Sequence, residues 1–242
     1  MPALSKPSEA PACRKIWLAL LPALLLPTLS ALFYFVIFDE AAMAKPIYLA
    51  TKVFTVLWPI FATVLILRLR IRLGPMTAEH RRSLLPGLAI GLAILGVMVI
   101  WMNSPWAEFI LSGGEKVRDK VKSLGFLDHF IFFAIFITLV HSFVEEFYWR
   151  WFVFGNLRKV LPLPAAHGIA AIGFAAHHLV VTCQYYSFGF ALFLAFCVAV
   201  GGLIWSLLYQ RYGSLLGAWL CHLFVDAGLM WVGYQMIFPN GT

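Results

Sequence analysis

Two adjacent glutamates, Glu145 and Glu146, lie in the middle of a long apolar stretch of the chain. Ionised carboxylates in hydrocarbon cost several kcal/mol each, so they normally face a bundle interior or a water-filled cavity, where they pair with other charges or do chemistry. Arg150 follows Glu146 at the i,i+4 spacing of an intrahelical ion pair. Glu145 then points about 100° away from Glu146 around the helix. We therefore predict that Glu146 has a structural role and that Glu145 is the carboxylate that takes part in the chemistry.

Three more polar side chains are expected at a similar depth in the membrane. Measured from the same end of each apolar segment at about 1.5 Å per residue, the depths are roughly 20, 21, 12 and 18 Å for Glu145, His178, His222 and Asp226. His222 and Asp226 are also i,i+4 neighbours on one helical face, as are His141 and Glu145. Scattered polar residues would not be expected to share a depth in this way. The spacing predicts one intramembrane polar centre built from three helices.

The composition indicates which elements position these residues. Of the 242 residues, 62% are hydrophobic and 12% are charged, and the mean hydropathy of +0.87 lies far outside the soluble range. A helix needs about 20 apolar residues to cross a hydrocarbon core roughly 30 Å thick. The sequence therefore predicts an all-α, polytopic transmembrane helix bundle. Its seven expected spans are Lys15–Phe38, Ile47–Leu67, Leu84–Met102, Phe130–Leu157, Pro164–Cys183, Phe188–Tyr209 and Ser214–Phe238.

The chain is expected to form one membrane domain, residues 15–242, after a disordered N-terminal lead, residues 1–14. The long loop at residues 103–129 is expected to contain a short amphipathic helix at the outer membrane face. The four cysteines have no pairing pattern and no metal-ligand spacing, so they are interpreted as small hydrophobic residues.

Basic residues predict the orientation of the bundle. Twelve of the eighteen fall on one side of the predicted topology: Lys6, Arg14, Lys15, Arg68, Arg70, Arg72, Arg81, Arg82, Arg150, Arg158, Lys159 and Arg211. The positive-inside rule then gives a cytoplasmic N-terminus and a C-terminus on the outer side. The net charge of +7 is thus mainly a topology signal. The expected surroundings are the lipid bilayer, with no nucleic-acid partner.

Three motifs on three apolar helices resemble the signature of a known family. They read EEFYWR from Glu145 to Arg150, FAAHH from Phe174 to His178, and HLFVD from His222 to Asp226. In this order they are similar to the CPBP intramembrane proteases (CAAX protease and bacteriocin-processing, also called the ABI or type II CAAX prenyl endopeptidase family). The similarity covers roughly residues 130–230, which would be the catalytic part.

The resemblance implies a role for each motif residue. Glu145 and His178 would position and activate a water, and His222 and Asp226 would stabilise the oxyanion that forms during peptide hydrolysis. Asp226 stands where the eukaryotic members commonly have asparagine. It would act in its protonated form, orient His222, or help to bind a cation. The supporting residues expected beside this set are Glu146, Arg150, Phe174 and His177.

Metal dependence is left open by the residues. Glu145, His178, His222 and Asp226 could together form a zinc-like ligand set. Their spacing lacks the compactness of an HExxH motif, so a mechanism that requires no cofactor is favoured, with a divalent metal such as zinc as the alternative.

The protein is predicted to be an intramembrane endopeptidase. It would hydrolyse membrane-associated protein or peptide substrates with a glutamate-activated water. One alternative is a proton- or ion-coupled transporter, which also buries carboxylates and histidines at mid-membrane. Another is a non-catalytic immunity or partner protein of the same family. We expect an integral protein of the bacterial inner (cell) membrane with a cytoplasmic N-terminus.

Overall fold

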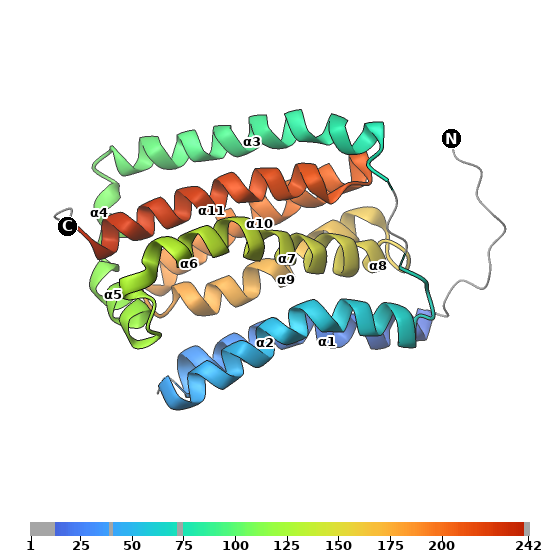
Figure 1. The fold of residues 1–242 in the computed structure, drawn as a ribbon, viewed down its shortest axis with the longest axis horizontal. Coiled ribbons are helices and arrows are strands. Elements are labelled where there is room, and N and C mark those ends of the chain that lie inside the picture. Colours follow the sequence, from blue (N-terminus) through green and yellow to red (C-terminus); the bar gives the residue numbers. More distant parts are fainter. Residues whose placement is uncertain (1–12, 39–40, 72–74, 240–242) are drawn as a thin grey trace.

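The computed structural model describes residues 13–38, 41–71 and 75–239. This part of the chain is a bundle of long helices that run side by side, without a strand (Figure 1). Seven helices are long and apolar enough to cross a membrane, which confirms the predicted all-α polytopic bundle. They are Cys13–Ile37, Pro46–Ile66, Ala78–Met102, Leu127–Leu157, Leu163–Thr182, Phe188–Tyr212 and Leu215–Ile237.

The third span begins earlier than hydropathy alone predicted. The prediction placed it at Leu84–Met102, whereas helix α3 covers Ala78–Met102. The earlier start comes from a capping box: the Thr77 hydroxyl accepts from the His80 backbone N–H, and the His80 ring accepts from the Thr77 backbone N–H at 2.8 Å. Satisfying these free N–H groups extends a helix into polar sequence.

The N-terminal lead was also predicted slightly too long. Helix α1 (Cys13–Leu32) already includes the last two residues of the predicted lead at 1–14. The rest of that predicted segment, residues 1–12, lies outside the described residues. The loop at 103–129 contains α4 (Ala107–Leu111) and α5 (Gly114–Ser123). A short helix in this loop is therefore confirmed, and its position at the membrane surface stays a prediction.

The fourth span, Leu127–Leu157, changes its helical type along its length. Two π-helical stretches, η4 (Ile137–His141) and η5 (Phe147–Phe154), flank the short α7 (Ser142–Glu146). The remaining segments are η3 (Leu127–His129), α6 (Phe130–Phe136) and α8 (Gly155–Leu157). A π-helical turn holds more residues than an α turn, so it changes the direction of the side chains that follow, and such turns are frequent at functional sites. Both glutamates lie between the two π stretches.

The last three spans are α9 (Leu163–Thr182), α10 (Phe188–Tyr212) and α11 (Leu215–Ile237). Gly213 ends α10 in the left-handed conformation, with φ 60°, which glycine adopts without a steric penalty. Ser214 then caps α11, because its hydroxyl accepts from the Leu216 backbone N–H at 3.2 Å. This short turn sets where α11 begins, and therefore where its polar residues lie.

Helices α3 and α11 lie side by side and pack closely through small residues (Figure 1). A Cβ atom on Gly87 would lie 2.2 Å from the backbone oxygen of Gly217, and one on Gly91 would lie 3.1 Å from the Cα of Cys221. Glycines let helix backbones approach this closely in membranes. The contact holds α11 against the bundle at the turn that precedes the third motif.

The second span consists of α2 (Ala41–Phe61) and η2 (Ala62–Ile66), and the first ends in η1 (Phe33–Ile37). In Figure 1 these two spans lie on the opposite side of the bundle from α3. Large apolar side chains remain exposed on the outside of several spans, including Leu85 at 73%, Ile100 at 72% and Phe132 at 75%. Hydrocarbon is the solvent that such a surface fits. The chain is an integral membrane protein.

Candidate active site

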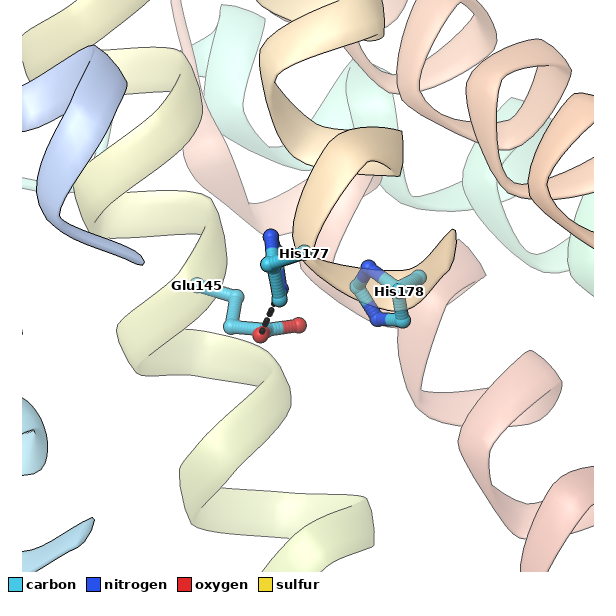
Figure 2. A group of neighbouring side chains, drawn as sticks. All are labelled: Glu145, His177 and His178. Atoms are coloured by element: carbon cyan, nitrogen blue, oxygen red, sulfur yellow. Dashed lines mark ion pairs between the residues drawn. The ribbon is translucent and has the colours of Figure 1, made fainter. Parts of the chain in front are cut away.

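The predicted residues come together from three helices. Glu145 and Glu146 lie on α7, His177 and His178 on α9, and His222 near the middle of α11. Figure 2 shows Glu145 directed from its helix toward the two adjacent histidines of α9. The similar depths counted along the three helices predicted that their polar residues meet, and the structure places these residues together.

The Glu145 carboxylate lies between imidazoles. Its Oε1 atom is 3.2 Å from Nε2 of His141 and 3.8 Å from Nε2 of His177, and its Oε2 atom is 3.7 Å from Nε2 of His222. The Glu145 side chain is 12% exposed. No cationic lysine or arginine is within ion-pairing distance of it in the described part of the chain. Glu145 is thus the carboxylate that is not bound to a guanidinium, as the spacing predicted.

Glu146 is more deeply buried and has two partners. Its Oε2 atom is 3.3 Å from Nε of Arg150, so the predicted ion pair is present, and neither side chain is more than 1% exposed. This contact lacks hydrogen-bond geometry, so Coulomb attraction holds it. The Arg150 guanidinium also lies over the rings of Phe174 at 4.7 Å and Trp205 at 5.0 Å, a favourable place for a desolvated cation.

The second partner of Glu146 was not predicted. Oε1 of Glu146 is 2.9 Å from Nδ1 of His222. A carboxylate accepts hydrogen bonds, so the Nδ1–H of His222 donates to it. The His222 ring is also stacked on Trp205, with centroids 3.9 Å apart and planes 14° apart. Glu146 therefore does more than pair with Arg150, because it also orients the histidine of the third motif.

The free nitrogen of His222 faces the centre of the site. Nε2 is 3.5 Å from Oδ1 of Asp226 and 3.7 Å from Oε2 of Glu145. The other oxygen of Asp226, Oδ2, is buried and has no hydrogen-bond partner among the described residues. An unsatisfied buried carboxylate oxygen is costly, so Asp226 is a group that needs a further ligand or a proton.

His178 presents one defined nitrogen. Its Nδ1 atom is 2.9 Å from the backbone oxygen of Phe174, one helical turn earlier. Because a carbonyl oxygen only accepts, Nδ1 carries the proton, and Nε2 keeps a free lone pair. The Phe174 ring packs against the same histidine at 4.7 Å. Phe174 thus supports the second motif through both its backbone and its ring.

His177 is held differently from its neighbour. Its ring is parallel to that of Trp149, with centroids 5.9 Å apart and planes 4° apart. Nδ1 of His177 is buried without a hydrogen-bond partner in the described chain, while Nε2 points to Glu145. His177 was predicted as a supporting residue, and it lies as close to the chemical carboxylate as a residue of the proposed set.

A possible metal-ligand group differs from the one that the sequence suggested. One oxygen of Glu145 and one nitrogen each of His177 and His178 lie within 4.8 Å of one another (Figure 2). A carboxylate with two imidazoles is a donor set that zinc accepts. The predicted set instead combined Glu145 and His178 with two residues of α11. His177 takes their place because it projects from α9 beside His178.

A small pocket reaches Glu145 from the side of the first two spans. Its polar lining residues are Tyr34, Tyr48, Thr51, Lys52, Thr55, His141, Glu145, Tyr148 and His177. Of the four main predicted residues, Glu145 lines this pocket. The other members adjoin Glu145 without lining it, since aromatic side chains of the bundle pack around them.

Sequence reasoning missed Lys52 and identified His141 only as an i,i+4 neighbour of Glu145. Lys52 Nζ lies 3.4 Å from Nδ1 of His141, on a helix 89 residues away in the chain. The available signal was a lysine inside a predicted apolar span, the same kind of signal that revealed the glutamates.

Comparison with known proteins gives one finding. Residues 127–228 match the family model described as type II CAAX prenyl endopeptidase Rce1-like. No curated protein and no solved structure matches the chain. The matched region contains all three motifs and each predicted site residue. This match to residues 127–228 supports the family resemblance that the three motifs indicated.

Proposed function

We propose that this protein is an intramembrane endopeptidase that cleaves membrane-associated protein or peptide substrates with a water activated by Glu145. The observation that carries the proposal is the arrangement around this carboxylate. An oxygen of Glu145 and a nitrogen of His178 lie within 4.8 Å of each other. A water that forms hydrogen bonds of about 2.8 Å to both groups fits a separation of this size.

The two groups would share the work on that water. Glu145 takes a proton from the water, and the lone pair on Nε2 of His178 accepts its second hydrogen bond and fixes its direction. The hydroxide oxygen attacks the carbonyl carbon of the peptide bond. The proton on Glu145 then passes to the leaving nitrogen as the carbon–nitrogen bond breaks, which regenerates the carboxylate.

The developing oxyanion would be stabilised from α11. Both ring nitrogens of His222 face carboxylate oxygens, which only accept hydrogen bonds when ionised. The ring donates at Nδ1 to Glu146, and its Nε2–H, which lies between Asp226 and Glu145, is the donor proposed for the oxyanion. In its protonated form Asp226 would donate a second hydrogen bond. Such preorganised donors are usually the largest single contribution to catalysis.

The substrate class is tested in native membranes. Protein termini are compared by terminal proteomics between cells that express the wild type and cells that express Glu145→Ala. We expect a set of new termini, from membrane-associated proteins or peptides, that appears with the wild type and is missing with the variant. Identical sets of termini at equal expression would contradict the proposed protease function.

The mechanism is proposed to need no metal, and this is tested separately. Dialysis of purified protein against a strong chelator is expected to leave proteolysis unchanged, because Glu145 and His178 suffice to activate the water. Loss of activity that returns with stoichiometric zinc would overturn the metal-free mechanism. The ligands would then be expected among Glu145, His177 and His178, whose donor atoms lie within 4.8 Å of one another.

Asp226→Asn completes this test. Asparagine matches the size of aspartate and donates the hydrogen bond that an ionised carboxylate lacks. We expect the variant to keep its activity in a peptide-cleavage assay within about threefold of the wild type. This corresponds to a change of less than about 1 kcal/mol in the activation free energy. A large loss of activity together with a loss of bound zinc would show that Asp226 is a ligand.

The proposal also covers the orientation of the protein and the membrane in which it lies. The positive-inside distribution of basic residues supports a cytoplasmic N-terminus, and the inner (cell) membrane of a bacterium is the proposed location. Cysteine labelling from either side of sealed vesicles, at Cys13 near the beginning of α1, tests the orientation directly.

A further inference from the structure

Lys52 is a cation inside a membrane span that has no acidic partner among the described residues. It lies in the second span, Pro46–Ile66, and no described carboxylate comes within 4.0 Å of its ammonium group. Its polar neighbour is His141, with Nζ 3.4 Å from Nδ1 and 3.5 Å from Nε2 of that ring. The ring of Tyr48 lies 5.1 Å from the same ammonium. Charged residues at such places are expensive and usually have a task.

His141 connects this cation to the active site. Its Nε2 atom is 3.2 Å from Oε1 of Glu145, one turn along the same span. Lys52, His141 and Glu145 therefore form a chain of contacts that crosses from α2 to α7. All three line the pocket that opens toward the first two spans.

The partners on each side determine where the proton of His141 lies. An ammonium group only donates, so the ring nitrogen that bonds to it must accept. An ionised carboxylate only accepts, so the nitrogen that faces Glu145 must donate. These demands are met when Nδ1 accepts from Lys52 and Nε2–H donates to Oε1 of Glu145. Lys52 therefore reinforces the tautomer that Glu145 requires.

From this geometry we infer that Lys52 and His141 are positioning residues for Glu145. The contact of His141 Nε2 with Oε1, at 3.2 Å, holds the plane of the carboxylate. It leaves Oε2, which faces His222, free to take the proton of the water. The inference rests on the proposed protease function, and it adds to it two residues outside the three motifs. A misplacement of a catalytic group by about 1 Å can lower the rate by about 100-fold.

Lys52→Met tests the inference in a cleavage assay on purified protein. Methionine keeps the length and apolar stem of lysine and removes the donor. We expect kcat to fall by about 10- to 100-fold, the usual cost of removing an outer partner of a catalytic group, with KM within about twofold because binding contacts are unchanged. Lys52→Arg, which keeps a donor-only cation, should recover most of the lost kcat. Lys116→Met removes an exposed lysine of α5 and serves as the matched control.

A substrate-binding role for Lys52 is distinguished with two peptides. They have the same apolar sequence and end in either a free carboxylate or a carboxamide. The positioning role predicts that Lys52→Met lowers kcat by the same factor on both. A defect confined to the peptide with the free carboxylate, and seen in KM, would show that Lys52 binds the substrate, which would overturn the inference. Wild-type kcat in Lys52→Met would overturn it as well.

A second measurement does not depend on activity. Solid-state NMR of protein with ¹⁵N-labelled histidine reports which ring nitrogen carries the proton, and His141→Gln identifies the signals of that ring. We expect a protonated Nε2 and an unprotonated Nδ1 at His141, and a shifted Nδ1 signal in Lys52→Met, where the ammonium group that faces Nδ1 is lost. A proton on Nδ1 in the wild type would refute the chain of contacts. The proposed protease function fails by a different result, namely no cleavage of any tested peptide by the wild-type protein.

Discussion

Glu145→Gln is expected to abolish proteolysis while the protein remains inserted and folded. Glutamine matches glutamate in size and keeps an oxygen that can accept from His141, so packing around α7 is preserved. The amide cannot take a proton from water. Loss of a general base typically lowers rates by about 100- to 10,000-fold, which would leave cleavage near the background of most assays.

The measurement is turnover of a peptide or membrane substrate by purified protein in detergent or nanodiscs. Thermal unfolding and size-exclusion profiles of the variant should match those of the wild type. Glu115→Gln replaces an exposed carboxylate of α5 and should keep full activity. Near-normal turnover by Glu145→Gln would show that another residue is the base, and the adjacent His177 and His178 would be the next to examine.

Arg150→Ala is expected to destabilise the folded protein. The guanidinium is 1% exposed and neutralises Glu146, which is completely buried. Removing one partner of a buried ion pair leaves an uncompensated charge and typically costs about 3–5 kcal/mol. The substitution also removes the contacts of the cation with two aromatic rings. The yield of folded protein should therefore fall, and the midpoint of thermal unfolding should drop by many degrees.

An exposed ion pair of similar spacing provides the control. Arg82 contacts Glu79 at 3.1 Å, and its side chain is 71% exposed. Exposed pairs contribute little because water and salt screen them. Arg82→Ala should change the unfolding midpoint by no more than a degree or two, roughly what such pairs contribute. Equal stability of Arg150→Ala and the wild type would mean that Glu146 is not ionised in the folded protein.

The sequence by itself determined the membrane class, the seven spans and the residues of the central site. Hydropathy suffices for the spans because each backbone polar group in hydrocarbon must be satisfied within its own helix. It also revealed Glu145 and Glu146, since buried carboxylates in apolar segments are rare. The start of α3 was misplaced because a capping box at Thr77, a local hydrogen-bond effect, extends the helix into polar residues.

The depth of a residue along its helix could be counted from the sequence. The direction in which its side chain points around the helix could not. The π-helical stretches on both sides of α7 change the rotation of the fourth span, so a regular helix gives no reliable side-chain directions there. His177 and His178 are neighbours in sequence and could not be assigned separate tasks by spacing. The structure distinguishes them, because His178 is held by the carbonyl of Phe174 and His177 lies along Trp149.

Contacts between distant segments were decided by the tertiary structure alone. The hydrogen bond between Glu146 and His222 joins residues 76 positions apart, and the contact between Lys52 and His141 joins residues 89 positions apart. Spacing within one helix contains no information about which face of another helix packs against it. That choice depends on the close approach of small residues, such as Gly87 and Gly217 between α3 and α11. The motifs therefore identified the residues that are proposed to react, whereas helix packing selected the residues that contact them.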